Sequence, residues 1–134
     1  MSENLLIGCT LIGVTLSDDQ HQIIFITEKG ALPATCYEEC CSHTWINDVE
    51  MPARQLGGLI TNINWLDLSH RNESSDDSLI QHYGFELYTT HGILTVEFRN
   101  KSNGYYGGSL DFASAFTPHE KAVKYLKPPY KVLG

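Results

Sequence analysis

The chain has 134 residues, of which 42% are hydrophobic and 19% are charged, and its formal net charge is −7. This composition predicts one globular domain over residues 1–134 and excludes a disordered chain. The acidic balance argues against direct binding of duplex nucleic acid, whose phosphates it would repel. No apolar run approaches the ~20 residues of a membrane helix, and the start at Met1 lacks the basic residues of a signal peptide. We therefore expect a cytosolic protein with no membrane partner.

Apolar segments separated by short polar turns predict the first three strands. They cover residues 11–16, 22–28 and 34–38. The connections are too short for crossovers, so these strands are expected to be antiparallel. The second segment is apolar on both faces, which predicts a central position in its sheet.

The middle of the chain contains one more predicted strand between two irregular segments. Residues 51–58 are expected to form a short helical turn that ends at glycine. Residues 59–68 alternate as a strand, with Ile60 and Trp65 on opposite faces. The polar and acidic residues 69–81 predict an exposed, mobile loop.

A hairpin is predicted by residues 85–90 and 93–99, which turn at His91-Gly92. A two-residue turn places Phe85 opposite Phe98 and gives the hairpin one apolar face.

A second hairpin is expected to follow directly, because Asn103-Gly104 is a strong turn signal. A loop or bulge over residues 103–105 would pair Phe98 with Leu110 and keep the apolar face continuous.

A C-terminal helix is predicted over residues 117–127, after a β core at residues 5–112. Thr117 is expected to cap it, Pro118 suits the first helical position and Glu120 completes a capping box. The apolar residues expected to pack on the sheet are Ala122, Val123 and Leu126. The predicted fold is mainly β, an antiparallel sandwich or strongly curved sheet of about seven strands with a C-terminal α-helix.

Three cysteines and one histidine lie close together in the sequence between residues 36 and 45. Cys36, Cys40, Cys41 and His43 are residue types that bind zinc, but adjacent cysteines in a strand point to opposite faces. A cysteine–histidine nucleophile would lack an accompanying oxyanion motif. We expect reduced cysteines packed in the core, without a metal, a cofactor or a catalytic residue. The predicted structural cluster consists of Cys40, Cys41, Ser42 and Trp45.

The segment Asn103-Gly104-Tyr105-Tyr106-Gly107-Gly108 is the second candidate site. Its glycines remove side chains where a ligand can approach the sheet, and Tyr105 can stack on a planar ligand. Arg99 and Lys101 can hold an anionic group. A tight turn with aromatic strand residues is the alternative interpretation. The candidate ligand-binding residues are Arg99, Lys101, Asn103, Tyr105, Tyr106, Lys121 and Lys124.

Several segments carry a resemblance to a known family. They are residues 39–42 (Glu-Cys-Cys-Ser), 45–48, 56–60, Gly92 with the strand after it, and 102–106 with Leu110 and Phe112. These segments resemble a small domain family that is common in phage genomes and whose function is unknown. The resemblance spans about Leu6 to Phe112, and the residues after Thr117 look like an addition. It implies a phage or prophage origin and a small cytosolic accessory protein, with no catalytic residue to carry over.

Three functions follow as hypotheses. The first is a non-catalytic, phage-type binding protein that counters host immunity in the host cytoplasm by sequestering a nucleotide-like signalling molecule. The second is an acidic protein inhibitor that binds a host defence protein directly, as anti-CRISPR proteins do. The third is a small zinc or thiol enzyme at Cys40, Cys41 and His43. The sequence leaves the oligomeric state open, including a homo-oligomer.

Overall fold

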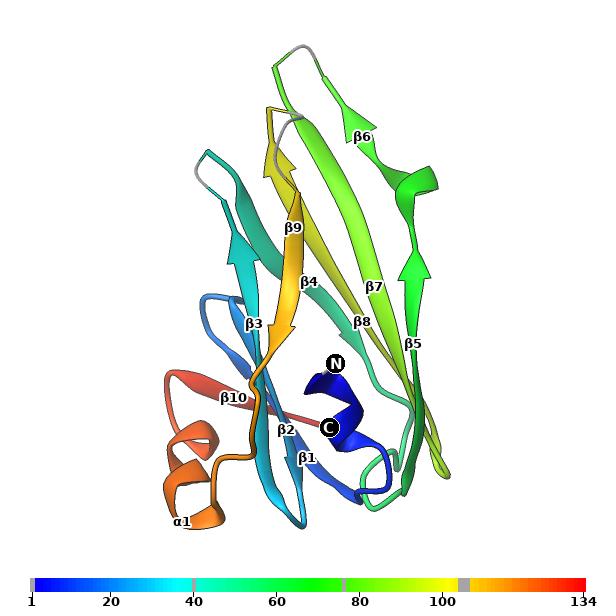
Figure 1. Cartoon of the computed structure of the whole chain (residues 1–134), viewed down its shortest axis with the longest axis vertical. Helices are drawn as coiled ribbons and strands as arrows, with labels where there is room; N and C mark the ends of the chain where they lie inside the picture. Colours follow the sequence, from blue (N-terminus) through cyan, green and yellow to red (C-terminus); the bar gives the residue numbers. More distant parts are fainter. Residues whose placement is uncertain (1, 40, 76, 104–106) are drawn as a thin grey trace.

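Two antiparallel sheets form a sandwich-like arrangement in the computed structural model, which describes residues 2–39, 41–75, 77–103 and 107–134 (Figure 1). The first sheet has the order β10-β1-β2-β3-β9, and the second has the order β4-β8-β7-β5, with β6 paired to β7. The first sheet contains β1 (Leu11–Ser17), β2 (Gln22–Thr27), β3 (Gly30–Glu38), β9 (Gly108–Phe112) and β10 (Tyr130–Leu133). The second contains β4 (His43–Glu50), β5 (Ile60–Asp67), β6 (Glu73–Ser74), β7 (Leu79–Thr89) and β8 (Gly92–Ser102).

The predicted fold class, mainly β with an antiparallel sandwich, is confirmed. The described residues form ten strands where about seven were expected, because β4, β6 and β10 lie in segments to which no strand was assigned. The strands predicted at residues 11–16, 22–28, 34–38 and 59–68 are all present. No helix in the described part of the chain combines the length and the hydropathy needed to cross a membrane.

Strand β2 is central in the first sheet, as its apolar pattern predicted. Phe25 faces the main core between the sheets, and its ring lies 5.9 Å from that of Phe85 and 5.9 Å from that of Phe112. Ile24 faces the other way, into a smaller core with Ala122. Both faces of β2 are therefore covered, which is why it carries no polar face.

The hairpin of β7 and β8 is present, but its register differs from the prediction by two residues. Thr89 pairs with Gly92, so the turn is Thr90-His91, and Phe85 lies opposite Val96 instead of Phe98. A shift of two residues leaves every side chain on its expected face. The apolar face therefore forms as predicted, and it is buried at Phe85, Leu87, Leu94, Val96 and Phe98.

The second predicted hairpin is wrong, because β9 does not pair with β8. Strand β9 crosses to the first sheet and pairs with β3, where Leu110 lies opposite Cys36. The edge of β8 is occupied by β4, which pairs with it from His43 to Glu50. Gly108 allows the close crossing, because an added Cβ would collide with Thr44 Oγ1. Of the expected loop, Gly104 and Tyr105 lie outside the described residues.

The C-terminal helix is shorter than predicted. Helix α1 (His119–Ala122) passes into the 3-10 helix η3 (Val123–Leu126). Thr117 does not cap it, because the residue before the helix is Pro118 and no side-chain capping hydrogen bond forms. The backbone N–H and C=O of Thr117 instead bond with Ala31, at 2.7 and 2.9 Å. With three residues per turn, Ala122 and Tyr125 share the buried side, whereas Val123 and Leu126 are exposed, contrary to expectation.

The connecting segments also differ from the sequence interpretation. Residues 51–58 form turns without a helix, although Gly57 has the expected left-handed backbone at φ +92°. The predicted loop at residues 69–81 contains the 3-10 helix η2 (Ser69–Arg71), strand β6 and the start of β7. Another 3-10 helix, η1 (Ser2–Leu6), lies between the sheets at the start of the chain (Figure 1).

Strand β5 contains a bulge, and the prediction that Ile60 and Trp65 lie on opposite faces is therefore wrong. The register with β7 shifts between Ile60 and Asn62. The extra residue brings Trp65 to the same side as the buried Ile60, so its ring meets those of Phe85 and Phe98.

Candidate ligand-binding site

The antiparallel pairing of β4 with β8 builds the candidate site. His43 lies opposite Lys101, and Trp45 lies opposite Arg99. Thr44, between the two aromatic residues, is fully buried, so alternation turns His43 and Trp45 to the outer face. Paired residues of adjacent strands share a face, which places both cations beside the two rings. We call the group His43, Trp45, Arg99, Lys101 and Asn103 the β4–β8 end site.

Two aromatic rings form one wall of the β4–β8 end site. The imidazole of His43 stacks on the indole of Trp45, with ring centroids 5.4 Å apart and planes inclined by 16°. The indole N–H of Trp45 donates to Asn47 Oδ1 at 3.4 Å. The stack gives the outer face a flat aromatic surface next to positive charge.

Arg99 and Lys101, the two cations of the site, form no ion pair with the carboxylates that the structure describes nearby. Glu97, two residues before Arg99 on the same face, is paired with Arg71 at 2.6 Å. Neither Arg99 nor Lys101 has an ion-pair partner within the described residues. The Nε atom of Arg99 is buried and has no hydrogen-bond partner among them either. The positive charge is therefore available to an anion.

A hollow of about 430 Å³ lies at the end of the second sheet, where β4 begins and β8 ends. Lys101, His43 and Asn103 line it together with Ser42 and Ser78. Hydroxyl, amide and cationic groups of this kind hold anionic oxygens. Cys41, Asp77 and Ser102 complete the lining. The structure thus brings the predicted ligand residues Lys101 and Asn103 next to the predicted cluster residues Cys41 and Ser42.

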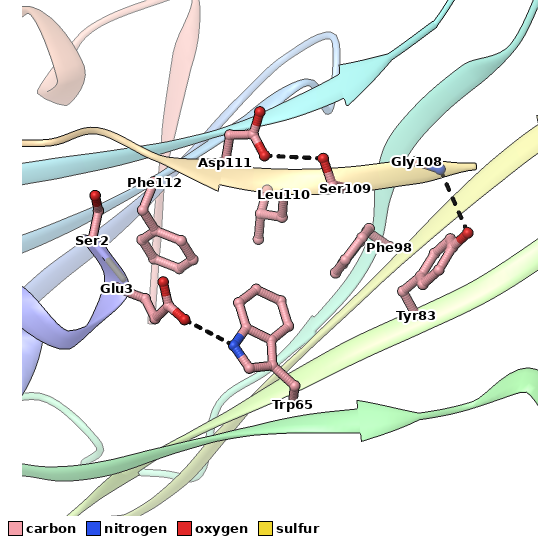
Figure 2. A pocket seen from close by; sticks show the side chains of 10 residues that line it. All are labelled: Ser2, Glu3, Trp65, Tyr83, Phe98, Gly108, Ser109, Leu110, Asp111 and Phe112. Carbon is pink, nitrogen blue, oxygen red and sulfur yellow. Dashed lines mark hydrogen bonds between the residues drawn. The ribbon is translucent and has the colours of Figure 1, made fainter. Parts of the chain in front are cut away.

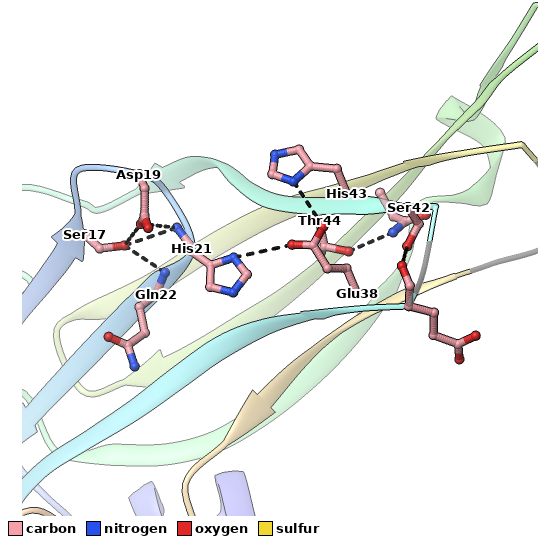
Figure 3. Close-up of polar contacts among 10 residues, drawn as sticks. Ser17, Asp19, His21, Gln22, Glu38, Ser42, His43 and Thr44 are labelled. Atoms are coloured by element: carbon pink, nitrogen blue, oxygen red, sulfur yellow. Dashed lines mark hydrogen bonds and ion pairs between the residues drawn. The ribbon is translucent and has the colours of Figure 1, made fainter.

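Glu38 at the end of β3 orients His43 from the other sheet. Its carboxylate accepts from Nδ1 of His43 at 3.2 Å and lies 3.8 Å from Nδ1 of His21 (Figure 3). The Ser42 hydroxyl donates to the carbonyl of Glu39 at 2.9 Å in the intervening turn. The edge of the end site is therefore joined to the first sheet.

The turn before His21 is stabilised by a carboxylate. Asp19 accepts from the Ser17 hydroxyl at 2.6 Å and from the backbone N–H of His21 at 3.0 Å (Figure 3). These hydrogen bonds, led by that of Ser17, lower the pKa of Asp19 below its usual value.

The described thiols occupy different environments. Cys36 is buried in the main core, and burial raises the pKa of its thiol to about 12. Cys9 is also buried, whereas Cys41 is exposed at the turn before β4. Cys40 lies outside the described residues. Among the residues that the structure places, no three His, Cys, Asp or Glu side chains form a group able to hold a metal.

The two predicted ligand lysines near the C-terminus do not join the end site within one chain. Lys121 and Lys124 lie on α1 and η3, at the opposite end of the molecule from the last residues of β8 (Figure 1). Tyr105 and Tyr106 lie outside the described residues. Sequence reasoning considered His43 only for zinc or thiol chemistry and Trp45 only for the structural cluster, and it did not single out Ser78. The alternation of His43 and Trp45 around Thr44 was the only local signal for their shared face.

A family model described as a domain of unknown function, DUF7448, matches residues 4–112. The chain belongs to this family. The DUF7448 match covers β1 to β9 and stops before α1, so the predicted extent of the family resemblance is confirmed. Neither the curated proteins nor the solved structures gave a match to this DUF7448 chain.

Proposed function

We propose that this DUF7448 protein is a non-catalytic binding protein that holds a nucleotide-like molecule at the β4–β8 end site. The register between β4 and β8 is the observation that carries the proposal, because it sets Arg99 and Lys101 beside the rings of His43 and Trp45. A base or other planar group stacks on aromatic and guanidinium planes, and its phosphates pair with the cations. Binding of this kind needs no reacting group.

The biological role that fits such binding is removal of a signal. We propose a phage-type protein that acts in the host cytoplasm and counters host immunity by sequestering a nucleotide-like signalling molecule. The phage association rests on the resemblance of the sequence segments given above. Lys121 and Lys124 can contribute only from a second copy of the chain, because they lie at the far end of their own molecule. Their participation would therefore require a homo-oligomer.

The test uses Trp45 as the reporter. In a Trp65→Phe background, Trp45 is the remaining tryptophan, and its fluorescence is followed during titration with nucleoside monophosphates and cyclic dinucleotides. We expect saturable quenching by at least one of them. Arg99→Gln and Lys101→Gln should each weaken that binding by about tenfold, as for loss of a charged hydrogen bond.

Arg54→Gln is the matched control, because it removes one exposed cation from a loop outside the site. It should leave the affinity unchanged. The proposal fails if none of these nucleotides quenches Trp45, or if Arg99→Gln and Lys101→Gln bind as tightly as Arg54→Gln.

Charge distribution favours a second candidate, direct inhibition of a host defence protein. All sixteen acidic residues lie within residues 1–120, together with only five of the nine basic ones. An acidic body of this kind suits a basic, nucleic-acid-binding surface on the partner. This candidate predicts an association with a protein that weakens steeply with added salt and is insensitive to Arg99→Gln.

A further inference from the structure

A second hollow, with a different chemistry, lies between the two sheets. It measures about 510 Å³ and is bounded by β5, β7, β8, β9 and η1 (Figure 2). Trp65, Tyr83, Phe98 and Phe112 supply its aromatic surface. We call this hollow the inter-sheet cleft. Its residues come from widely separated segments, so no local motif in the sequence indicated it.

Trp65 shows that the inter-sheet cleft is open. Its ring contacts three aromatic rings, with centroid distances of 5.3 Å to Phe85, 6.4 Å to Phe98 and 6.2 Å to Phe112. An indole surrounded in this way would be buried if the sheets closed completely, yet 43% of Trp65 is exposed. Tyr83 stacks on Phe98 at 5.1 Å and extends the aromatic surface. The cleft therefore presents the faces and edges of several rings to a small molecule.

The charge of the inter-sheet cleft is negative. Glu3 on η1 points into it, and its Oε2 accepts from the indole N–H of Trp65 at 3.0 Å (Figure 2). Asp111 on β9 pairs with Thr35 and turns its carboxylate to the opposite side of the strand from Phe112, where it accepts from the Ser109 hydroxyl at 2.9 Å, so Glu3 is the carboxylate that enters the cleft (Figure 2). The described lining residues include no lysine, arginine or histidine. Within this described lining, a phosphate or carboxylate ligand would meet only like charge.

We propose that the inter-sheet cleft binds a small organic cation, an ammonium group carried on an apolar or aromatic body. The ammonium group pairs with the Glu3 carboxylate and lies against the ring faces, which attract cations through their quadrupoles. The apolar body packs on Trp65, Phe98 and Phe112 and displaces water from them. This ligand class is opposite in charge to the one proposed for the β4–β8 end site, so each site is proposed to bind a different ligand.

The experiment isolates Trp65 as the reporter by the substitution Trp45→Phe, which removes the other tryptophan. Two probes with the same phenyl ring are titrated, phenethylamine as the cation and 3-phenylpropionate as the anion. We expect phenethylamine to change the Trp65 emission saturably and to bind about tenfold or more tightly than 3-phenylpropionate. Equal affinity for the two probes, or no saturable change with phenethylamine, overturns the proposal.

Glu3→Gln tests the carboxylate itself. The amide oxygen of Gln can still accept from Trp65 Nε1, so this variant removes the charge and keeps the hydrogen bond. We expect it to weaken phenethylamine binding about tenfold and to leave 3-phenylpropionate binding unchanged or slightly tighter. Glu50→Gln, an exposed carboxylate on β4, changes the net charge equally and should have no effect. If the two variants bind phenethylamine alike, Glu3 does not hold the cation and the proposal is wrong.

Discussion

At the scale of single residues, the environment decides which side chains can take part in chemistry. The four cysteines looked alike in the sequence, and three lie among the described residues. Cys36 packs opposite Leu110 inside the core, while Cys41 is exposed beside the hollow of the end site. Strand alternation buries Cys36, and the turn before β4 exposes Cys41. Two thiols that are close in sequence therefore have different environments.

Alkylation at pH 9 tests the difference in environment between Cys36 and Cys41. A thiol with the usual pKa of 9.0 is half ionised at that pH, whereas Cys36, with a pKa of about 12, stays protonated because burial disfavours the thiolate. We expect a short pulse of iodoacetamide to modify Cys41 and to leave Cys36 unmodified, as read by peptide mass spectrometry. Both should react in guanidinium chloride. Modification of native Cys36 as fast as Cys41 would contradict the prediction.

At the scale of elements, side chains from outside a hairpin hold its turn. Gln55, in the loop before β5, is buried and donates from Nε2 to Thr89 Oγ1 at 2.9 Å and to the carbonyl of Gly92 at 3.4 Å. The Thr89 hydroxyl also donates to the Gly92 carbonyl, at 3.2 Å. These contacts join the two ends of the turn and explain why the hairpin turns at Thr90-His91, one position before the predicted place.

Gln55→Ala should loosen that turn. The substitution removes two hydrogen bonds and leaves a cavity, so we expect the free energy of unfolding to fall by about 1–3 kcal/mol. Urea unfolding measures the loss, and amide hydrogen exchange should accelerate at His91 and Gly92 while β2 stays protected. Unchanged exchange at the turn would show that Gln55 does not hold it.

At the scale of the whole molecule, the segment beyond the family match completes the first sheet. Strand β10 pairs with β1 from Val14 to Ser17, and the Tyr130 hydroxyl donates to Gln22 Oε1 at 2.7 Å. The ring of Tyr125 lies edge-on to that of Tyr130, with centroids 5.1 Å apart, and covers the outer face of β2. The segment therefore protects both an apolar face and a strand edge.

Truncation after Thr117 tests this role. It exposes Ile24 and the edge of β1, so we expect a loss of at least about 2 kcal/mol of stability and a tendency to associate through the open edge. Thermal unfolding and size-exclusion chromatography measure the two effects. The control Tyr130→Phe removes only a hydroxyl and should cost about 0.5–1.5 kcal/mol. A truncated protein as stable and as monodisperse as the full chain would contradict this account.

The sequence by itself determined the local features of this protein. Alternation and apolar runs predicted four of the strands and the β7–β8 hairpin, and they identified its buried face, because side-chain direction along a strand depends only on neighbouring residues. The glycine- and tyrosine-rich segment after Asn103 selected Arg99, Lys101 and Asn103 as candidates because they are near it in the chain, and these residues lie along β8 and directly after it.

Only the tertiary structure decided which strands pair and where hollows form. Strand β9 joins β3 because β4 already occupies the edge of β8, a competition between segments more than fifty residues apart in sequence. The bulge that turns Trp65 inward and the helix η1 that brings Glu3 to it depend on the same packing. Both candidate sites consist of residues that meet only after the sheets assemble, and non-local pairing of this kind leaves no periodic pattern in the chain.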